Sequence, residues 1–153
     1  MKIYLGADHG GFELKENFKD YISRNDQDLE IEDCGALVND PTDDYPLIAF
    51  RVAQKVAADP ADDCLGILLC RSGSGVVIAA NKVKGIRAVE LYNEKIAIHA
   101  KSHNHANVIA FSGDQLSLLE MMDLFEVFIK TPQDSSDRHE RRIQQITNYE
   151  NQR

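Results

Sequence analysis

The stretch from residue 65 to residue 82 has the pattern with the clearest chemical meaning. Residues 65–70 are apolar and end in Cys70, which is typical of a strand buried on both faces. Gly73 and Gly75 follow in a short turn, and the small residues over 76–81 predict a helix. Backbone amides at a helix start attract anions and favour thiolates. A lone cysteine is more often a small buried hydrophobic residue, but this position makes Cys70 a candidate base or nucleophile over an anionic substrate.

Two more groups in the first half of the chain can bind anions or sugar hydroxyls. Asp8 and His9 follow the first predicted strand, where a carboxylate and an imidazole can hydrogen-bond a sugar or a phosphate. The alternative is a helix-capping aspartate beside an exposed histidine. The amides of residues 73–75 can hold an oxyanion or a phosphate. The same stretch lacks P-loop spacing, and residues 6–11 lack the GxGxxG dinucleotide fingerprint.

Histidines and arginines dominate the candidate groups of the second half. His99 and His103 are four residues apart and share a helix face, but no third metal ligand is evident, so we expect no metal. A single histidine acting as general acid or base is favoured over a metal ligand, and the alternative is a solvated helix end. Arg138 and Arg142 are also one turn apart near a helix start, and this spacing suits a phosphate. The alternative is a set of surface ion pairs, each worth about 0–1 kcal/mol.

Alternating strands and helices position these groups. Apolar runs predict strands at 2–7, 29–34, 64–70, 86–90 and 107–111, and amphipathic stretches predict helices at 12–24, 44–58, 76–81, 93–102, 116–129 and 137–148. This alternation predicts one α/β domain over residues 1–153, with a doubly wound, five-stranded parallel sheet in a three-layer αβα arrangement. The last helix, at about 137–148, has a weak apolar face. We expect it to pack against a partner subunit or to reach back over a site.

Composition and charge argue against several classes of protein. No apolar run approaches the roughly 18 residues that span a bilayer, and the first residues lead into a strand without a signal-peptide pattern. A net charge of −8 argues against general binding to nucleic acid or to membrane surfaces. The three cysteines form neither zinc-like pairs nor an even disulfide set. We therefore expect a cytoplasmic protein without nucleic-acid or membrane partners.

Taken together, these residues resemble the type B ribose-5-phosphate isomerases and the broader family that includes galactose-6-phosphate isomerase subunits. The resemblance covers nearly the whole chain, and its motifs are specific in combination. The matching stretches are residues 4–9 with Gly11-Phe12, Asp33-Cys34-Gly35, Asp44-Tyr45-Pro46, Cys70 with Gly73, Gly75 and residues 78–82, residues 85–88, His103-Asn104 with Asn107-Val108, and Arg138-His139 with Arg142.

The resemblance implies a Rossmann-like fold and isomerisation of a sugar phosphate without cofactor or metal. It implies a homodimer or tetramer whose active sites are built from two subunits. The catalytic roles that it implies are Cys70 as the base between C2 and C1, Ser72 beside the enediolate, the amides of Gly73, Ser74 and Gly75 as oxyanion donors, and His103 with Asp8 in ring opening. The substrate contacts that it implies are His9, Arg138 and Arg142 for the phosphate, with Tyr45 and Asn104 for the sugar.

Two positions depart from the family pattern. Arg71 stands where the family usually has glycine, and Asp114 stands where it usually has an arginine that contacts phosphate. We hypothesise that Arg71 restores part of the lost grip on the anion. The competing interpretation is a changed substrate, such as a galactose- or allose-type hexose 6-phosphate. A third interpretation is a sugar-phosphate-binding protein without catalysis, against which the retained Cys70 and His103 speak.

Overall fold

A parallel sheet of five strands forms the centre of the domain. The computed structural model describes residues 1–61 and 63–152. Its strands are β1 (Lys2–Ala7), β2 (Glu30–Asp33), β3 (Cys64–Cys70), β4 (Ala88–Glu90) and β5 (Val108–Ser112). Their order across the sheet is β2-β1-β3-β5-β4, and every neighbouring pair is parallel. The chain winds outward to both sides of the β1–β3 pair, so the predicted doubly wound parallel sheet is confirmed.

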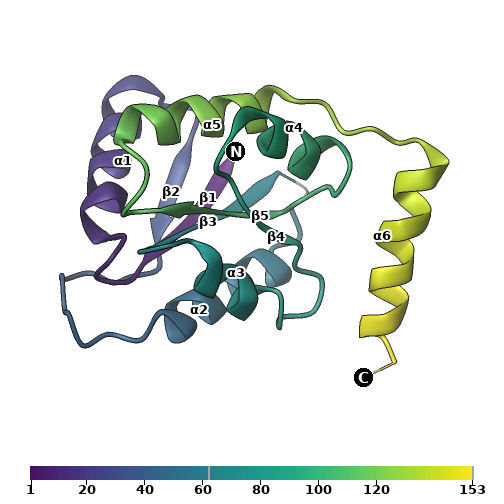
Figure 1. The fold of residues 1–153 in the computed structure, drawn as a ribbon, viewed down its shortest axis with the longest axis horizontal. Coiled ribbons are helices and arrows are strands. Elements are labelled where there is room, and N and C mark those ends of the chain that lie inside the picture. The colour runs from purple at the N-terminus through teal and green to yellow at the C-terminus, as the bar shows by residue number, and fades with distance from the viewer. Residues whose placement is uncertain (62, 153) are drawn as a thin grey trace.

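Helices cover both faces of this sheet. These helices are α1 (Phe12–Asn25), α2 (Tyr45–Ala58), α3 (Ser74–Ala80), α4 (Glu94–Ser102) and α5 (Leu118–Lys130), and a further helix, α6 (Asp137–Glu150), lies off the sheet. One face carries α1, α4 and α5 and the other carries α2 and α3, which gives the predicted three layers (Figure 1). Within residues 1–61 and 63–152, no helix is long and apolar enough to cross a membrane.

Two helix starts differ from the sequence prediction. α3 begins at Ser74 rather than at residue 76, with Gly73 as its N-cap. Gly73 has φ +80°, a left-handed conformation that glycine adopts without steric cost, so the turn after β3 is tighter than expected. α5 begins at Leu118 rather than at residue 116 because Ser117 and Glu120 form a capping box. Capping residues and glycine dihedrals therefore set these starts, and hydrophobic periodicity does not detect them.

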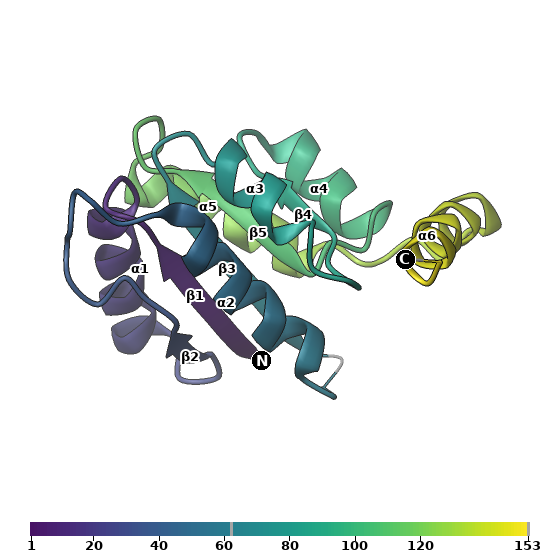
Figure 2. The same cartoon turned by 90° about the horizontal axis from the view of Figure 1, so that it is seen from below.

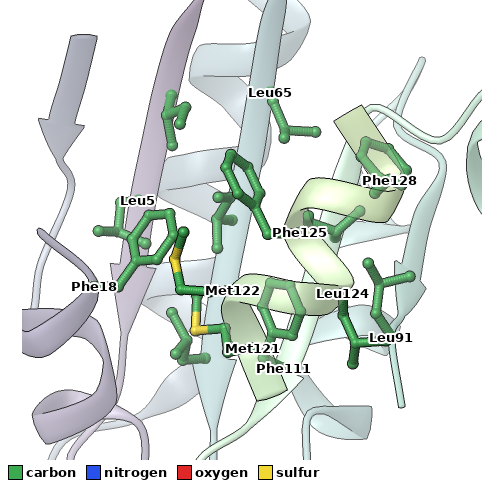
Figure 3. Packing of buried hydrophobic residues seen from close by; sticks show 14 of the residues in the cluster. Leu5, Phe18, Leu65, Leu91, Phe111, Met121, Met122, Leu124, Phe125 and Phe128 are labelled. Carbon is green, nitrogen blue, oxygen red and sulfur yellow. The ribbon is translucent and has the colours of Figure 1, made fainter. Parts of the chain in front are cut away.

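Aromatic rings join two helices over one face of the sheet. Phe18 from α1 and Phe125 from α5 meet edge to face, with ring centroids 5.4 Å apart and planes at 84°. Both rings belong to the hydrophobic core under α1, α4 and α5, together with Phe111 from β5 (Figure 3). Edge-to-face pairs stabilise by about 0.5–1.5 kcal/mol beyond their burial. This contact therefore fixes α1 and α5 relative to each other.

α6 projects away from the rest of the domain, as both views show (Figures 1 and 2). His139 is the one buried residue among the described residues of this helix. On its apolar side, Ile146 is 50% exposed and Tyr149 is 56% exposed. Near its end, a Glu150 carboxylate oxygen accepts a hydrogen bond from the Gly85 N–H at 3.0 Å. Its apolar side chains thus contribute little to the core of the chain that carries them.

We expect Phe125→Ala to lower the free energy of unfolding by about 3–5 kcal/mol, because a buried aromatic ring is lost and a cavity remains. Urea denaturation followed by circular dichroism measures the change. Leu119→Ala is the matched control, since Leu119 lies on the same helix and is 72% exposed. The control should change stability by less than about 0.5 kcal/mol. Equal losses in the two variants would contradict this assignment of the core.

Candidate active site

The turns after β1, β3 and β5 meet at the carboxyl edge of the sheet. The Asp8 N–H donates to the Leu69 carbonyl at 3.3 Å, and the Gly113 N–H donates to the Cys70 carbonyl at 2.8 Å. The Ser112 hydroxyl adds a bond of 2.6 Å to the Arg71 carbonyl. In a doubly wound sheet, ligands bind at the carboxyl ends of the two neighbouring strands between which the winding direction reverses. Here these strands are β1 and β3. The site predicted around Asp8 and Cys70 lies at that edge.

Asp8 is buried and already holds backbone amides. Its Oδ1 accepts hydrogen bonds from the N–H groups of Gly10 at 2.9 Å and Gly11 at 3.2 Å. Burial raises the pKa of Asp8, and these two amides oppose the shift. The carboxyl group therefore holds the turn before α1 and is also a buried acid at the ligand-binding edge. The alternative made from the sequence, a helix-capping Asp8 beside an exposed histidine, is wrong, because Gly11 is the N-cap of α1 and the His9 side chain is only 24% exposed.

The Cys70 thiol is buried at the end of β3 and faces the glycine turn. Its Sγ accepts a hydrogen bond from the Gly73 N–H at 3.1 Å. In this structure, therefore, the Gly73 amide serves Cys70, while Ser72 lies exposed on the same turn. The amides of Ser74 and Gly75, in the first turn of α3, have no carbonyl one turn back to bond.

Two side chains, one from α2 and one from β4, flank the glycine turn. A Cβ at Gly75 would lie 2.9 Å from Cζ of Tyr45, so the Tyr45 ring packs directly on the backbone there. On the other side, Oε2 of Glu90 accepts a hydrogen bond from the Ser74 hydroxyl at 2.8 Å. Sequence reasoning did not find Glu90. The signal that could have revealed Glu90 is its position: it ends β4, and alternation along the strand puts it on the same face as Ala88.

The two departures from the family pattern meet in space. The Arg71 guanidinium lies 3.6 Å from an Asp114 carboxylate oxygen, and both side chains are more than half exposed. An exposed pair of this kind is worth about 0–1 kcal/mol. Arg71 therefore has a weakly held anionic partner that an incoming phosphate can replace. Its predicted part in binding an anion stays a prediction.

Asp43 is a second residue that the sequence did not reveal. Its Oδ1 lies 2.7 Å from Nδ1 of His9 and also accepts from the His9 backbone N–H at 3.1 Å. The two residues are 34 positions apart in the chain. Neither spacing nor periodicity links them, and only the folding of the loop before α2 brings them together.

A second cluster surrounds His103 and the start of α6. The His103 ring stacks on His139 with centroids 4.2 Å apart and on His99 at 4.5 Å. The Arg138 Nε–H donates to Nε2 of His139 at 3.1 Å. Burial lowers the pKa of His139, and His103 and Arg138 lower it further. Neutral His139 can thus accept the bond from Arg138 and hold that side chain in place.

A groove runs beside this cluster. It measures about 440 Å³ and lies between α6 and the residues at the start of β4. Its lining includes His103, Asn104 and Arg142 as well as Ile86 and Ile143. Three of the predicted substrate residues therefore border one groove, together with apolar side chains of α6.

The two clusters lie at opposite edges of the sheet within one chain. Cys70 pairs with Ser112 at the carboxyl ends of β3 and β5, whereas His103 precedes Val108, the first residue of β5. The Arg87 guanidinium, just before β4, donates to the carbonyls of Asn104 and His105, which places them at the amino edge. Strands rise by about 3.3 Å per residue, so the length of β5 alone separates the clusters by roughly 13 Å. The predicted site residues around Cys70 and those around His103 therefore do not come together within one chain.

Among the residues that the structure describes, two trios of side chains have ligand atoms close enough together to hold a metal ion. They are His103 with Asp134 and His139, and Asp8 with His9 and Asp43. In the first trio, the Arg138 guanidinium donates to His139 and puts a positive charge beside it. In the second, amides and the His9 ring already occupy carboxylate oxygens. Hydrogen bonds engage Nε2 of His139 and the Oδ1 atoms of Asp8 and Asp43, and we assign neither trio to a metal.

We expect the stability of Asp8→Asn, measured relative to the wild type, to be greater at neutral pH than at acid pH. The pKa of Asp8 is raised in the folded state, so folding favours the protonated carboxyl. This contribution is complete below the unfolded pKa and is lost as pH rises through the folded pKa. The stability of Asp8→Asn minus that of the wild type should therefore grow between about pH 4 and pH 7 in urea denaturation. Asp123→Asn, on the exposed side of α5, controls for the substitution, and a constant difference for Asp8→Asn would refute the expectation.

Comparison with known proteins places the chain in a family. The family model described as Ribose/Galactose Isomerase matches residues 3–146. Ribose-5-phosphate isomerase B of Mycobacterium tuberculosis is 39% identical over 150 residues, which cover 98% of this chain and 90% of that protein. A crystal structure of a ribose 5-phosphate isomerase from Thermotoga maritima superposes with a TM-score of 0.87 at 39% identity, over 96% of this chain and 97% of that one. Ribose-5-phosphate isomerase B of Mycoplasma genitalium, crystallised with bound ribulose-5-phosphate, gives a TM-score of 0.91 at 37% identity, over 99% and 97% of the two chains. On these matches, together with the strand order and the turn around Cys70, the chain belongs to the Ribose/Galactose Isomerase family.

Proposed function

We propose that this chain is an aldose–ketose isomerase that interconverts ribose 5-phosphate and ribulose 5-phosphate. Membership of the isomerase family supports the reaction, and the names of the bacterial relatives support the pentose. The observation that carries the proposal for this chain is the Cys70 thiol, held 3.1 Å from the Gly73 amide beside Asp8. A buried, amide-bonded thiol at the ligand-binding edge is suited to moving a proton.

Cys70 is the base in the proposed reaction. Its thiolate takes the proton from C2 of the open-chain aldose and returns a proton to C1, while the hydroxyl proton passes from O2 to O1. The negative charge of the enediolate develops near the start of α3, where the amides of Ser74 and Gly75 are free of helical partners. Each such donor contributes about 2.7–4 kcal/mol in other enzymes with oxyanion holes. Ser72 is the side chain expected beside the enediolate.

Ring opening and phosphate binding require groups from the second cluster. Opening a furanose moves a proton from the anomeric hydroxyl to the ring oxygen, which suits His103 together with the buried acid Asp8. Arg138 and Arg142 supply charge for the phosphate, with His9 at the other edge and with Tyr45 and Asn104 as sugar contacts. No cofactor is required, since the thiol and the amides supply the proton transfers and the charge stabilisation.

The proposed site is shared between two chains. His103 and Arg142 lie at the amino edge of the sheet, and Cys70 lies at the carboxyl edge, so the full set can meet only across a subunit contact. The projecting α6, with exposed Ile146 and Tyr149, supports such a contact in a homodimer or tetramer. A single domain over residues 1–153 and a cytoplasmic location, consistent with three cysteines that are not joined in disulfides, complete the proposal.

Arg71 favours a second candidate substrate. Asp114 stands where the family usually has an arginine, and its pairing with Arg71 changes the charge at the edge of the site. A hexose 6-phosphate of the galactose or allose type requires the same proton transfers over a longer carbon chain. A non-catalytic sugar-phosphate-binding protein would retain the phosphate ligands without needing the Cys70–Gly73 contact.

We expect the wild-type protein to isomerise ribose 5-phosphate and Cys70→Ala to lower kcat by about 10²–10⁴-fold with little change in KM, because only proton transfer is lost. Formation of the ketose, followed in a coupled assay, measures both constants. The same assay with galactose 6-phosphate and allose 6-phosphate at matched concentration tests the hexose alternative. Cys64→Ala is the control, since Cys64 lies at the opposite end of the same strand.

Equal rates for Cys70→Ala and the wild type would refute Cys70 as the base. Faster turnover of a hexose phosphate would transfer the proposal to that substrate. Binding of a phosphosugar without turnover of any would favour the non-catalytic interpretation.

We expect two inactive variants to restore activity when they are mixed. Cys70→Ala removes the base and Arg142→Ala removes a phosphate ligand. If each site takes these residues from different chains, a hybrid dimer contains one intact site, and random reassociation restores up to about a quarter of wild-type activity. The mixture is unfolded, refolded and assayed beside each variant alone. A mixture no more active than its components would show that both residues act from the same chain.

A further inference from the structure

Asp43 is the last residue of the loop that joins β2 to α2 before the capping position of the helix. The loop folds back so that Asp43 reaches the turn after β1. One oxygen, Oδ1, accepts from the His9 backbone N–H at 3.1 Å and lies 2.7 Å from Nδ1 of the same residue. The side chain of Asp43 is 16% exposed and that of His9 is 24% exposed. The contact is thus largely sheltered from solvent and joins one residue through both its backbone and its ring.

The other oxygen of Asp43 is left without a hydrogen bond. Oδ2 is buried and has no partner among residues 1–61 and 63–152. Leaving a buried polar atom unpaired is unfavourable, and such exceptions are rare in folded proteins. An aspartate kept for loop structure alone can lie at the surface, as exposed Asp40 does, whose Oδ1 accepts hydrogen bonds from both the amide and the hydroxyl of Thr42. Asp43 therefore keeps its contact with His9 although its Oδ2 is left without a hydrogen bond.

The contact with Asp43 decides which nitrogen of His9 faces the site. Oδ1 already accepts the His9 backbone N–H, so it acts as an acceptor, and the short contact requires the proton to be on Nδ1. Nε2 is then the nitrogen left for a ligand. The charged groups around this ring are Asp43, Asp8 and Asp40. An imidazole held by one carboxylate in this way has a single orientation and a single tautomer.

We propose that Asp43 is a positioning residue of the active site, which holds His9 with its Nδ1–H on Asp43 and presents Nε2 to the phosphosugar. The proposal rests on the proposed isomerase function for the identity of the ligand, and on the hydrogen bonds alone for the tautomer. Asp43 does not touch the substrate. It acts through His9, and it also anchors the loop that ends one residue before Tyr45, whose ring packs on the Gly75 backbone. One carboxylate therefore links the turn after β1 to the side chain that covers the turn after β3.

The kinetic test uses three single variants of the full chain. Asp43→Ala removes the acceptor, and we expect KM for ribose 5-phosphate to rise about tenfold with kcat within about twofold, because a hydrogen bond to a charged group is lost before the chemical step. Asp43→Asn keeps an oxygen acceptor without the charge and should recover part of the loss. Asp40→Ala is the matched control, since it disturbs the same loop without touching His9, and its KM should stay near the wild-type value.

A spectroscopic readout separates positioning from loop structure. Long-range ¹H–¹⁵N spectra, with the His9 signals assigned by comparison with His9→Gln, should show Nδ1 protonated in the neutral ring of the wild type. Asp43→Ala should shift the ring toward the Nε2–H form that an unconstrained histidine side chain prefers. A wild-type ring with the proton on Nε2, or an Asp43→Ala variant that matches Asp40→Ala in KM, would overturn the proposal. A wild type that isomerises no phosphosugar would refute the proposed function, and the tautomer of His9 would then still decide the role of Asp43.

Discussion

The close approach of three turns at the carboxyl edge is the constraint on which the rest of the site depends. The turns after β1, β3 and β5 lie against one another, and a Cβ on Gly11 would lie 2.5 Å from Cβ of Leu69. Gly113 packs equally tightly against Gly10, and its N–H bonds the carbonyl of Cys70. Side chains at these positions would push the turns apart. The absence of Cβ atoms therefore allows the Cys70 thiol and the Asp8 carboxyl to share one edge.

Packing at this edge also explains why polar groups are tolerated there. Asp8 is buried at a cost that shows in its raised pKa, and the amides of Gly10 and Gly11 offset part of that cost. Asp43 leaves one oxygen without a partner among the described residues. Strained or unsatisfied groups persist where the surrounding structure holds them, and functional sites are where they gather. The Phe18–Phe125 contact and the core around it supply the stability that this edge does not.

The charged groups of the proposed site are divided between two ends of the domain. Acid, thiol and amides lie at the carboxyl edge, whereas His103, Arg138 and Arg142 gather where α6 leaves the domain. Burying all of these groups in one chain would bring arginines and carboxylates into a single small core, at a large desolvation cost. A site closed by a second chain keeps the arginines and the carboxylates on separate parts of each chain. The apolar side of α6 is exposed, and the helix projects from the domain (Figure 1), which is consistent with that division.

The sequence by itself determined the fold class, the order of elements and the residues of the turn around Cys70, because periodicity and glycine placement are local properties. It also determined the family, through motifs spread along the whole chain. Only the tertiary structure decided that His9 pairs with Asp43, that Ser74 pairs with Glu90 and that Arg71 faces Asp114. It also decided that His103 and Cys70 lie at opposite edges within one chain. These are contacts between residues far apart in sequence, set by strand order and by loop packing, and no local pattern encodes them.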